Sequence, residues 1–315
     1  MKDILVIHIG AGKHDPNKLK KYKTLLRNAL SKTSIVEASD VIESSPLTNT
    51  GYGSSLNLLG KVECDASFIT NDKIGAVVNM SCKNPTKELF RVFQYLDTLY
   101  ESDETDLTSP VMLTYPLLKN LVPHIVDDDL VSEKSRKLYD MYKDKIFQGD
   151  YSKHCAIPHE ISDTIGITHI SDNETTIVTS SGGNFFKLPG RIGCAGVIGA
   201  AIARKKLDDC EICCMCSGNG EQIIKSKLAW EIANNIYNVA GDEYGEYLER
   251  KVYELNPKFY VGFIIILNYQ SRVQLLYGHT TPTFYFGFRS PNQTRVILSS
   301  SDKLGHFTFG EYSLH

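Results

Sequence analysis

The sequence has no long apolar run and no strong excess of charge, and each absence excludes a class of function. No stretch approaches the roughly 18 consecutive apolar residues of a membrane-spanning helix, and the net charge is only −3. Nucleic-acid or membrane binding is therefore not expected as a main activity. The opening MKDILVIHIG is a short apolar run before glycine, which indicates a buried strand rather than a secretory signal. We expect a reduced protein of the cytoplasm or nucleus.

The eight cysteines lack the spacing of a zinc site. The run CEICCMC, residues 210–216, is the densest group, but no second, separated pair of cysteines accompanies it. Zinc sites of the usual kind combine two separated ligand pairs. We favour a buried strand in which Cys serves as a small hydrophobic residue, with a metal site as the alternative.

Repeats, low-complexity tracts and a clear domain boundary are also absent. Residue patterns predict strands near 4–9, 61–68, 74–80, 165–170, 175–180, 211–216, 258–267, 271–277 and 283–289, and helices over 85–100 and 221–236. A further helix is expected after Asp15 as N-cap with Pro16 in first position, carrying an apolar stripe of Leu19, Tyr22, Leu26, Ala29 and Leu30. Residues 144–162 are polar and predicted to be irregular. This mixed order favours helices layered on sheets.

One hairpin brings two hydroxyls together. Residues 171–174 are predicted to form a four-residue turn, so that Ile170 faces Thr175. Counting back in antiparallel register places Thr164 opposite Ser181, and directly opposed residues share a face. Taken alone, the hairpin favours an ordinary Thr–Ser pair on a sheet.

Four segments in order carry a resemblance: IHIGAGKH, TNTGYGSSLNLLGKVECDAS, SDTIG…TSSGG…KLPGRIG and CSGNGEQIIKSKLAWE. Together with the later YGHTTPTFYFGF, they resemble the type 2 asparaginase superfamily of N-terminal nucleophile hydrolases, and within it most closely the threonine aspartase (taspase) branch. The resemblance covers nearly the whole chain. It implies an α+β fold, the four-layer αββα sandwich of these hydrolases, with no catalytic metal or other cofactor.

The resemblance also implies self-cleavage between Asp163 and Thr164. The single domain, 1–315, would then consist of an alpha subunit, 1–163, and a beta subunit, 164–315, assembled as a homodimer of processed heterodimers. The chemistry is coherent, because a threonine hydroxyl needs a base to become a nucleophile. A free α-amino group titrates near 7.7–8.0 and can take the proton, whereas an amide nitrogen cannot.

Further site residues follow from the same match. The resemblance assigns Ser181 to a hydrogen bond with the nucleophile, Ser217 and the backbone N–H of Gly218 to the oxyanion hole, Asn49 to the neighbourhood of the nucleophile, and Arg191 and Lys18 to the acidic group of the substrate. Without it, Ser217 is typical of a helix N-cap, Asn49 of a turn and Arg191 of a surface.

The match departs from true asparaginases at Cys194. They carry an aspartate there, which binds the free α-amino group of the substrate. A neutral thiol does not pair with an ammonium ion, and burying that ion unpaired costs several kcal/mol. A peptide-bound aspartate has no such charge, so we expect an endopeptidase that cleaves protein substrates after aspartate. The alternatives are an isoaspartyl peptidase or L-asparaginase, and a catalytically silent binding protein.

Overall fold

Two sheets form the centre of the molecule. The computed structural model describes residues 2–100, 108–118, 121–122, 130–148, 164–172, 174–270, 272–303 and 305–314. The larger sheet has the order β12 (Gln293–Ser300), β11 (Thr283–Ser290), β1 (Asp3–Gly12), β5 (Ile165–Ser171), β6 (Thr175–Ser181), β2 (Cys64–Ile69), β3 (Ile74–Met80) and β4 (Met112–Thr114). The smaller has the order β13 (Thr308–Ser313), β10 (Val273–His279), β9 (Val261–Tyr269), β8 (Cys210–Gly218) and β7 (Ile202–Lys206).

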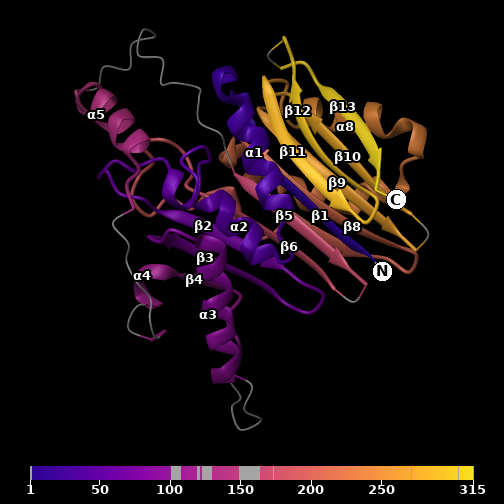
Figure 1. Ribbon diagram of the computed structural model, residues 1–315, viewed down its shortest axis with the longest axis horizontal. Coiled ribbons are helices and arrows are strands. Elements are labelled where there is room, and N and C mark those ends of the chain that lie inside the picture. The colour runs from indigo at the N-terminus through magenta and orange to yellow at the C-terminus, as the bar shows by residue number, and fades with distance from the viewer. Residues whose placement is uncertain are drawn as a thin grey trace.

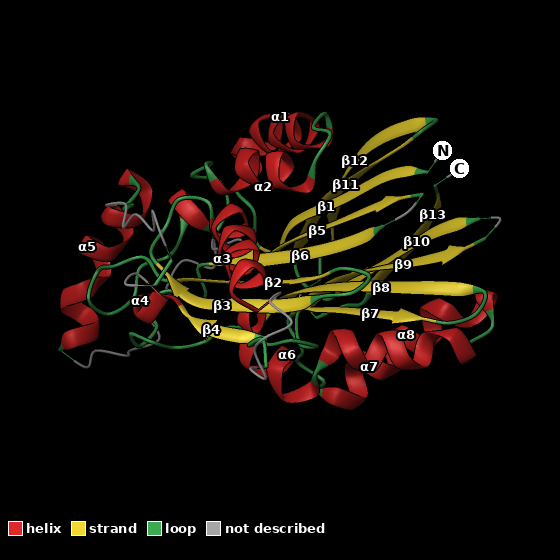
Figure 2. Ribbon diagram, turned by 90° about the horizontal axis from the view of Figure 1, so that it is seen from below, coloured by secondary structure: helices red, strands yellow, loops and turns green. Residues whose placement is uncertain are grey.

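Helices cover the outer face of each sheet (Figure 2). The larger sheet carries α1 (Leu19–Leu30), α2 (Ile35–Glu43) and α3 (Pro85–Tyr100), and the smaller carries α6 (Gly220–Ser226), α7 (Leu228–Asn235) and α8 (Tyr244–Leu255). Two more helices, the short α4 (Tyr115–Leu118) and the longer α5 (Glu133–Phe147), lie toward the end of the molecule that holds β2, β3 and β4 (Figure 1). The predicted αββα sandwich is thereby confirmed.

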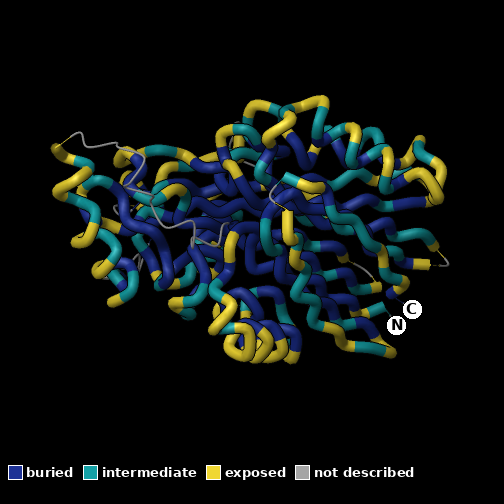
Figure 3. Tube along the Cα trace, turned by 90° about the horizontal axis from the view of Figure 1, so that it is seen from above, coloured by how far each residue is buried: buried dark blue, intermediate teal, exposed yellow. Residues whose placement is uncertain are grey.

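Three hydrophobic clusters hold these layers together. One lies between the larger sheet and its helices, and includes Leu26 and Leu89. The second joins the facing sheets through side chains such as Val6 and Met215. The third packs the other helices on the smaller sheet. The central strands are accordingly buried, and exposure concentrates on the outer helices, the turns and the edge strands β4, β12 and β13 (Figure 3). No helix among the described residues has the length and apolarity needed to cross a membrane.

The predicted strands with the clearest patterns are confirmed. The hairpin pairs Ile170 with Thr175 and Ile165 with Ser180, which is the predicted register. The cysteine run forms β8, and its four cysteines are buried. Asp15 caps as expected, although its side chain accepts from Asn17 N–H in a short 3₁₀ turn that precedes α1.

Other predictions were wrong in detail. The helix expected over 221–236 is two helices, because Lys227 adopts a left-handed conformation with φ of 47° between α6 and α7. The segment 144–162, expected to be irregular, is helical at its start, since α5 continues to Phe147, and residues 149–162 lie outside the described residues. Leu19 is 39% exposed and does not belong to the buried stripe of α1. The elements α2, α4, α5, α8, β4, β7, β12 and β13 were not predicted.

Candidate active site

Thr164 stands at the entrance of β5, directly before its first residue. It is buried, and its Oγ1 lies 3.5 Å from Cys194 Sγ. Side chains alternate along a strand, so Thr164 shares the face of Thr168, whose hydroxyl contacts Met215 of the opposite sheet. The nucleophile candidate therefore faces the space between the sheets. Asp163 lies outside the described residues, and cleavage before Thr164 stays a prediction.

Ser181 and Asn49 shape the turn that follows β6. Ser181 Oγ accepts a hydrogen bond from the backbone N–H of Gly183 at 3.0 Å. Asn49 donates from Nδ2 to the backbone carbonyl of Gly183 at 2.9 Å. The backbone carbonyl of Asn49 accepts from Gly182 N–H at 2.7 Å. Both side chains are buried. They hold the loop of residues 49–55 against the strand end opposite Thr164, while the expected bond from Ser181 to Thr164 stays a prediction.

Ser217 and Gly218 end β8 rather than open a helix. Ser217 Oγ accepts from the backbone N–H of Ala11 at 2.9 Å, and Asn219 supplies the side-chain cap of α6. The N-cap interpretation of Ser217 was therefore wrong, because the strand continues one residue beyond it. Gly218 has φ of 137°, and a Cβ there would lie 2.1 Å from the carbonyl oxygen of Tyr260. Only glycine fits this backbone.

Arg191 is held on one edge by an acidic side chain. Its Nε and Nη2 donate to Glu221 Oε1 at 2.9 and 2.7 Å. Burial favours a higher pKa for Glu221, but the hydrogen bond and charge of Arg191 bring that pKa below its usual value. Lys18, the other expected cation, forms an ion pair with Asp15 at 3.0 Å in the turn before α1.

Two buried charges near Arg191 were not predicted. Asp65 accepts from the backbone N–H groups of Gly193 and Asn79 at 2.7 and 3.0 Å, and so fixes the loop between Arg191 and Cys194. Burial raises the pKa of the Asp65 carboxyl and lowers the pKa of the Lys187 ammonium. The sequence holds both residues inside the resembling segments, but the only available signal was their charge within otherwise apolar or glycine-rich runs.

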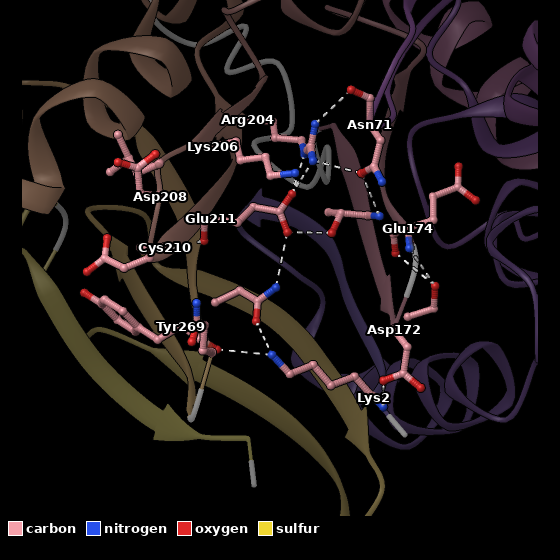
Figure 4. Close-up of a pocket in the computed structure, with 16 residues that line it drawn as sticks. Lys2, Asn71, Asp172, Glu174, Arg204, Lys206, Asp208, Cys210, Glu211 and Tyr269 are labelled. Carbon is pink, nitrogen blue, oxygen red and sulfur yellow. Dashed lines mark hydrogen bonds and ion pairs between the residues drawn. The ribbon is translucent and has the colours of Figure 1, made fainter.

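A separate polar cavity lies at the other end of the sheets (Figure 4). Its volume is about 240 Å³, and its lining includes Ser171, the last residue of β5, and Cys210, the first of β8. Thr164 and Ser217 stand at the opposite ends of these strands. Arg204 and Glu211 form a part-buried ion pair in this cavity at 2.5 Å, so its central charges are already paired.

Comparison with known proteins adds the following. A model of the asparaginase family matches residues 1–275. A plant-type L-asparaginase of Pyrococcus abyssi is 27% identical over 65% of this chain and 66% of its own length. One from Pyrobaculum calidifontis is 26% identical over 93% of this chain and 99% of its own. An isoaspartyl peptidase/L-asparaginase of Mus musculus is 28% identical over 66% of this chain and 60% of its own. The match to the Pyrococcus protein thus leaves about a third of that relative uncovered.

Proposed function

This chain belongs to the asparaginase family, and we propose that it is a hydrolase that uses Thr164 to attack an amide carbonyl close to a carboxylate. The observation that carries the proposal is the placement of Thr164. It is a buried hydroxyl at the mouth of a central strand, with Cys194 in contact at 3.5 Å and the register placing Ser181 opposite. Among the described residues, the loop that holds Cys194 also holds Arg191, the cation suited to a carboxylate.

The proposed reaction begins with cleavage of the Asp163–Thr164 bond, which gives Thr164 a free α-amino group. That amine takes the proton of Oγ1 as the oxygen attacks the substrate carbonyl, and then gives it to the departing nitrogen. An ester on Thr164 results, and water hydrolyses it. Ser217 and the N–H of Gly218 are the proposed donors to the developing oxyanion. Removing one such donor typically costs about 3–4 kcal/mol of transition-state stabilisation.

Two substrate classes fit this chemistry. The relatives favour L-asparagine and β-aspartyl peptides, because those compared above are L-asparaginases or isoaspartyl peptidases. Arg191 would then hold the α-carboxylate while the side-chain amide is attacked.

Cys194 favours the second class, a peptide-bound aspartate. The residue is buried against Thr164, so a substrate ammonium there would meet a thiol instead of a carboxylate. In a protein substrate this nitrogen is part of a peptide bond and carries no charge. Arg191 would hold the aspartate side chain, and the main-chain carbonyl would be attacked. The protein would then act as an endopeptidase that cleaves the peptide bond after aspartate.

Intact mass tests the shared mechanism. The purified wild-type chain should give two fragments that break before residue 164, and Thr164→Ala should give one uncut chain without hydrolytic activity. Thr164→Ser keeps a hydroxyl and should still be cut, more slowly. An uncut wild-type chain that nevertheless hydrolyses substrate would remove the need for a new amino terminus and overturn the mechanism.

Substrate assays on the processed protein separate the two classes. Ammonia release from L-asparagine, cleavage of a β-aspartyl dipeptide, and cleavage of an Asp-Gly peptide are measured side by side. Dominant activity on the first two identifies the family's small substrates, and activity confined to the third identifies the endopeptidase. A processed protein inert toward all three would contradict a hydrolase of either class and favour a binding protein.

A further inference from the structure

Lys187 is a buried lysine whose ammonium group has one hydrogen-bond acceptor among the described residues. Its side chain belongs to a residue only 5% exposed. Its Nζ donates to the backbone carbonyl of Glu63, and in the described part of the chain this is its single hydrogen bond. An ammonium group has three N–H donors. A buried, charged N–H donor without an acceptor costs free energy. The surroundings of Lys187 therefore favour binding of a group that accepts hydrogen bonds from its Nζ.

Arg191 directs its free edge to the same place. Glu221 occupies Nε and Nη2, and no described residue accepts from Nη1. The common point is Gly183, which has φ of 69°. A Cβ at Gly183 would lie 2.8 Å from Arg191 Nη1 and 3.3 Å from Lys187 Nζ. The two nitrogens therefore converge on one side of a glycine, close enough for a single small anion to contact both.

The neighbouring carboxylates leave these donors open. Glu221 is committed to the other edge of Arg191. Asp65 lowers the cost of burying Lys187 through its charge, but its oxygens accept from the backbone of Asn79 and Gly193. Among the described residues, no ion pair joins Asp65 to either cation. The charges of the two cations are thus balanced by Asp65 and Glu221, while Lys187 Nζ and Arg191 Nη1 keep N–H donors from which no described residue accepts. This is the arrangement expected of a preformed anion site.

We propose that Lys187 and Arg191 form one subsite that grips the substrate carboxylate from two sides, with Lys187 as a specificity-determining residue. The proposal rests on the hydrolase function above and refines it: the substrate must present a carboxylate that reaches Gly183. It also differs from the assignment by resemblance, which gives the second cation as Lys18. A neutral amide in the same position would fill fewer donors and bind more weakly.

Succinate binding to the processed protein tests the subsite independently of turnover. Calorimetry is carried out on wild type, on Lys187→Met, which keeps length but removes charge, on Lys187→Arg, which keeps charge, and on Lys18→Met, which removes the cation assigned by resemblance. We expect at least a tenfold loss of succinate affinity in Lys187→Met, with partial recovery in Lys187→Arg. The surface variant Lys258→Met is the matched control and should bind like wild type. A folded Lys187→Met that binds succinate normally, or a loss confined to Lys18→Met, overturns the proposal.

A second measurement avoids dependence on folding of the variants. In wild-type protein labelled with ¹⁵N at lysine, the Lys187 Nζ resonance should shift on addition of succinate and stay in place with succinamide. An unmoved resonance at saturating succinate contradicts the subsite. Kinetics distinguish this failure from failure of the function. If succinate binds but no substrate is hydrolysed, the subsite stands and the hydrolase function is contradicted. If substrate is hydrolysed and Lys187→Met leaves KM unchanged, the hydrolase function stands and the subsite is contradicted.

Discussion

Cys194 is the residue on which the substrate question turns. It is buried, begins the short turn Cys194–Gly196, and contacts the hydroxyl of Thr164. Its loop is fixed by the hydrogen bond from Gly193 N–H to Asp65. A side chain at this position is therefore held beside Thr164, the proposed nucleophile, and a change of its chemistry should change substrate choice with little change in architecture.

We predict that Cys194→Asp increases activity on L-asparagine. A carboxylate here would pair with the free α-ammonium of the substrate, and a charge-assisted hydrogen bond contributes about 1.5–3 kcal/mol, or roughly ten- to hundredfold in kcat/KM. Ammonia release gives the measurement. Cys194→Ser has similar size without the charge and should show no gain. If a folded, processed Cys194→Asp gains nothing over Cys194→Ser, the residue does not control recognition of the ammonium.

The sequence could point to some site residues and not to others for a physical reason. The pairing of Thr164 with Ser181 follows from strand register, which depends only on local alternation and turn length, whereas their roles in the site come from the family resemblance. Lys187 and Asp65 lie far apart in the sequence, and their importance arises from burial beside Arg191. Burial of that kind arises only when the layers assemble, so no local sequence pattern predicts it.

At the scale of elements, the Glu43 side chain joins α2, α3 and β6. It is the last residue of α2 and is fully buried. Its carboxylate accepts from the hydroxyl and N–H of Thr86 in the first turn of α3, and from Ser180 Oγ of β6 at 2.7 Å. Ser180 in turn contacts Thr50 Oγ1 at 2.8 Å, in the loop that contains Asn49. This network ties two helices to the strand end facing Thr164.

The network makes stability depend on pH in a defined window. Burial raises the pKa of Glu43 from 4.5 to about 7, against the lowering effect of its hydrogen bonds, and the nearby charge of Asp40 adds to the rise. Below pH 4.5 the carboxyl is protonated in both states. Between pH 4.5 and 7 the unfolded chain releases the proton first, so the free energy of unfolding falls as pH rises, by up to about 3 kcal/mol.

We therefore predict that Glu43→Gln flattens this decline. Urea unfolding at a series of pH values from 4 to 8 measures it, with the exposed Glu246→Gln as control. The advantage of Glu43→Gln over wild type should grow from pH 4.5 to 7 and then level off. Parallel pH curves for the two proteins would show that Glu43 ionises as readily in the folded state as in the unfolded one.

Element prediction succeeded where a pattern was local and failed where packing decided. The alternation in β5 and β6 and the apolar stripe of α3 are visible in the sequence, and all three elements lie where expected. The break between α6 and α7 is not visible, because Lys227 is an ordinary helix former that tertiary packing holds in a left-handed conformation. The edge strands β12 and β13 are partly exposed, and none of their residues is buried.

At the scale of the molecule, the two predicted subunits interleave. β1 belongs to residues 1–163, yet it pairs with β5 on one side and β11 on the other, both from residues 164–315. β6 pairs with β2 across the same division. In Figure 1 the indigo β1 accordingly lies among strands of the later colours. Neither predicted subunit contains a complete larger sheet, and each would expose the edges that the other covers.

We predict that cleavage before Thr164 leaves one inseparable particle. The processed protein should elute from size exclusion with both fragments in equal amounts, because separation would break the ladders of β1 and β6 and expose the core between the sheets. Residues 164–315 expressed alone should lack cooperative unfolding, and co-expression with residues 1–163 should restore it. The prediction fails if residues 164–315 alone form a stable, cooperatively folded protein. In that case the strands of residues 1–163 are not needed for the beta subunit to fold.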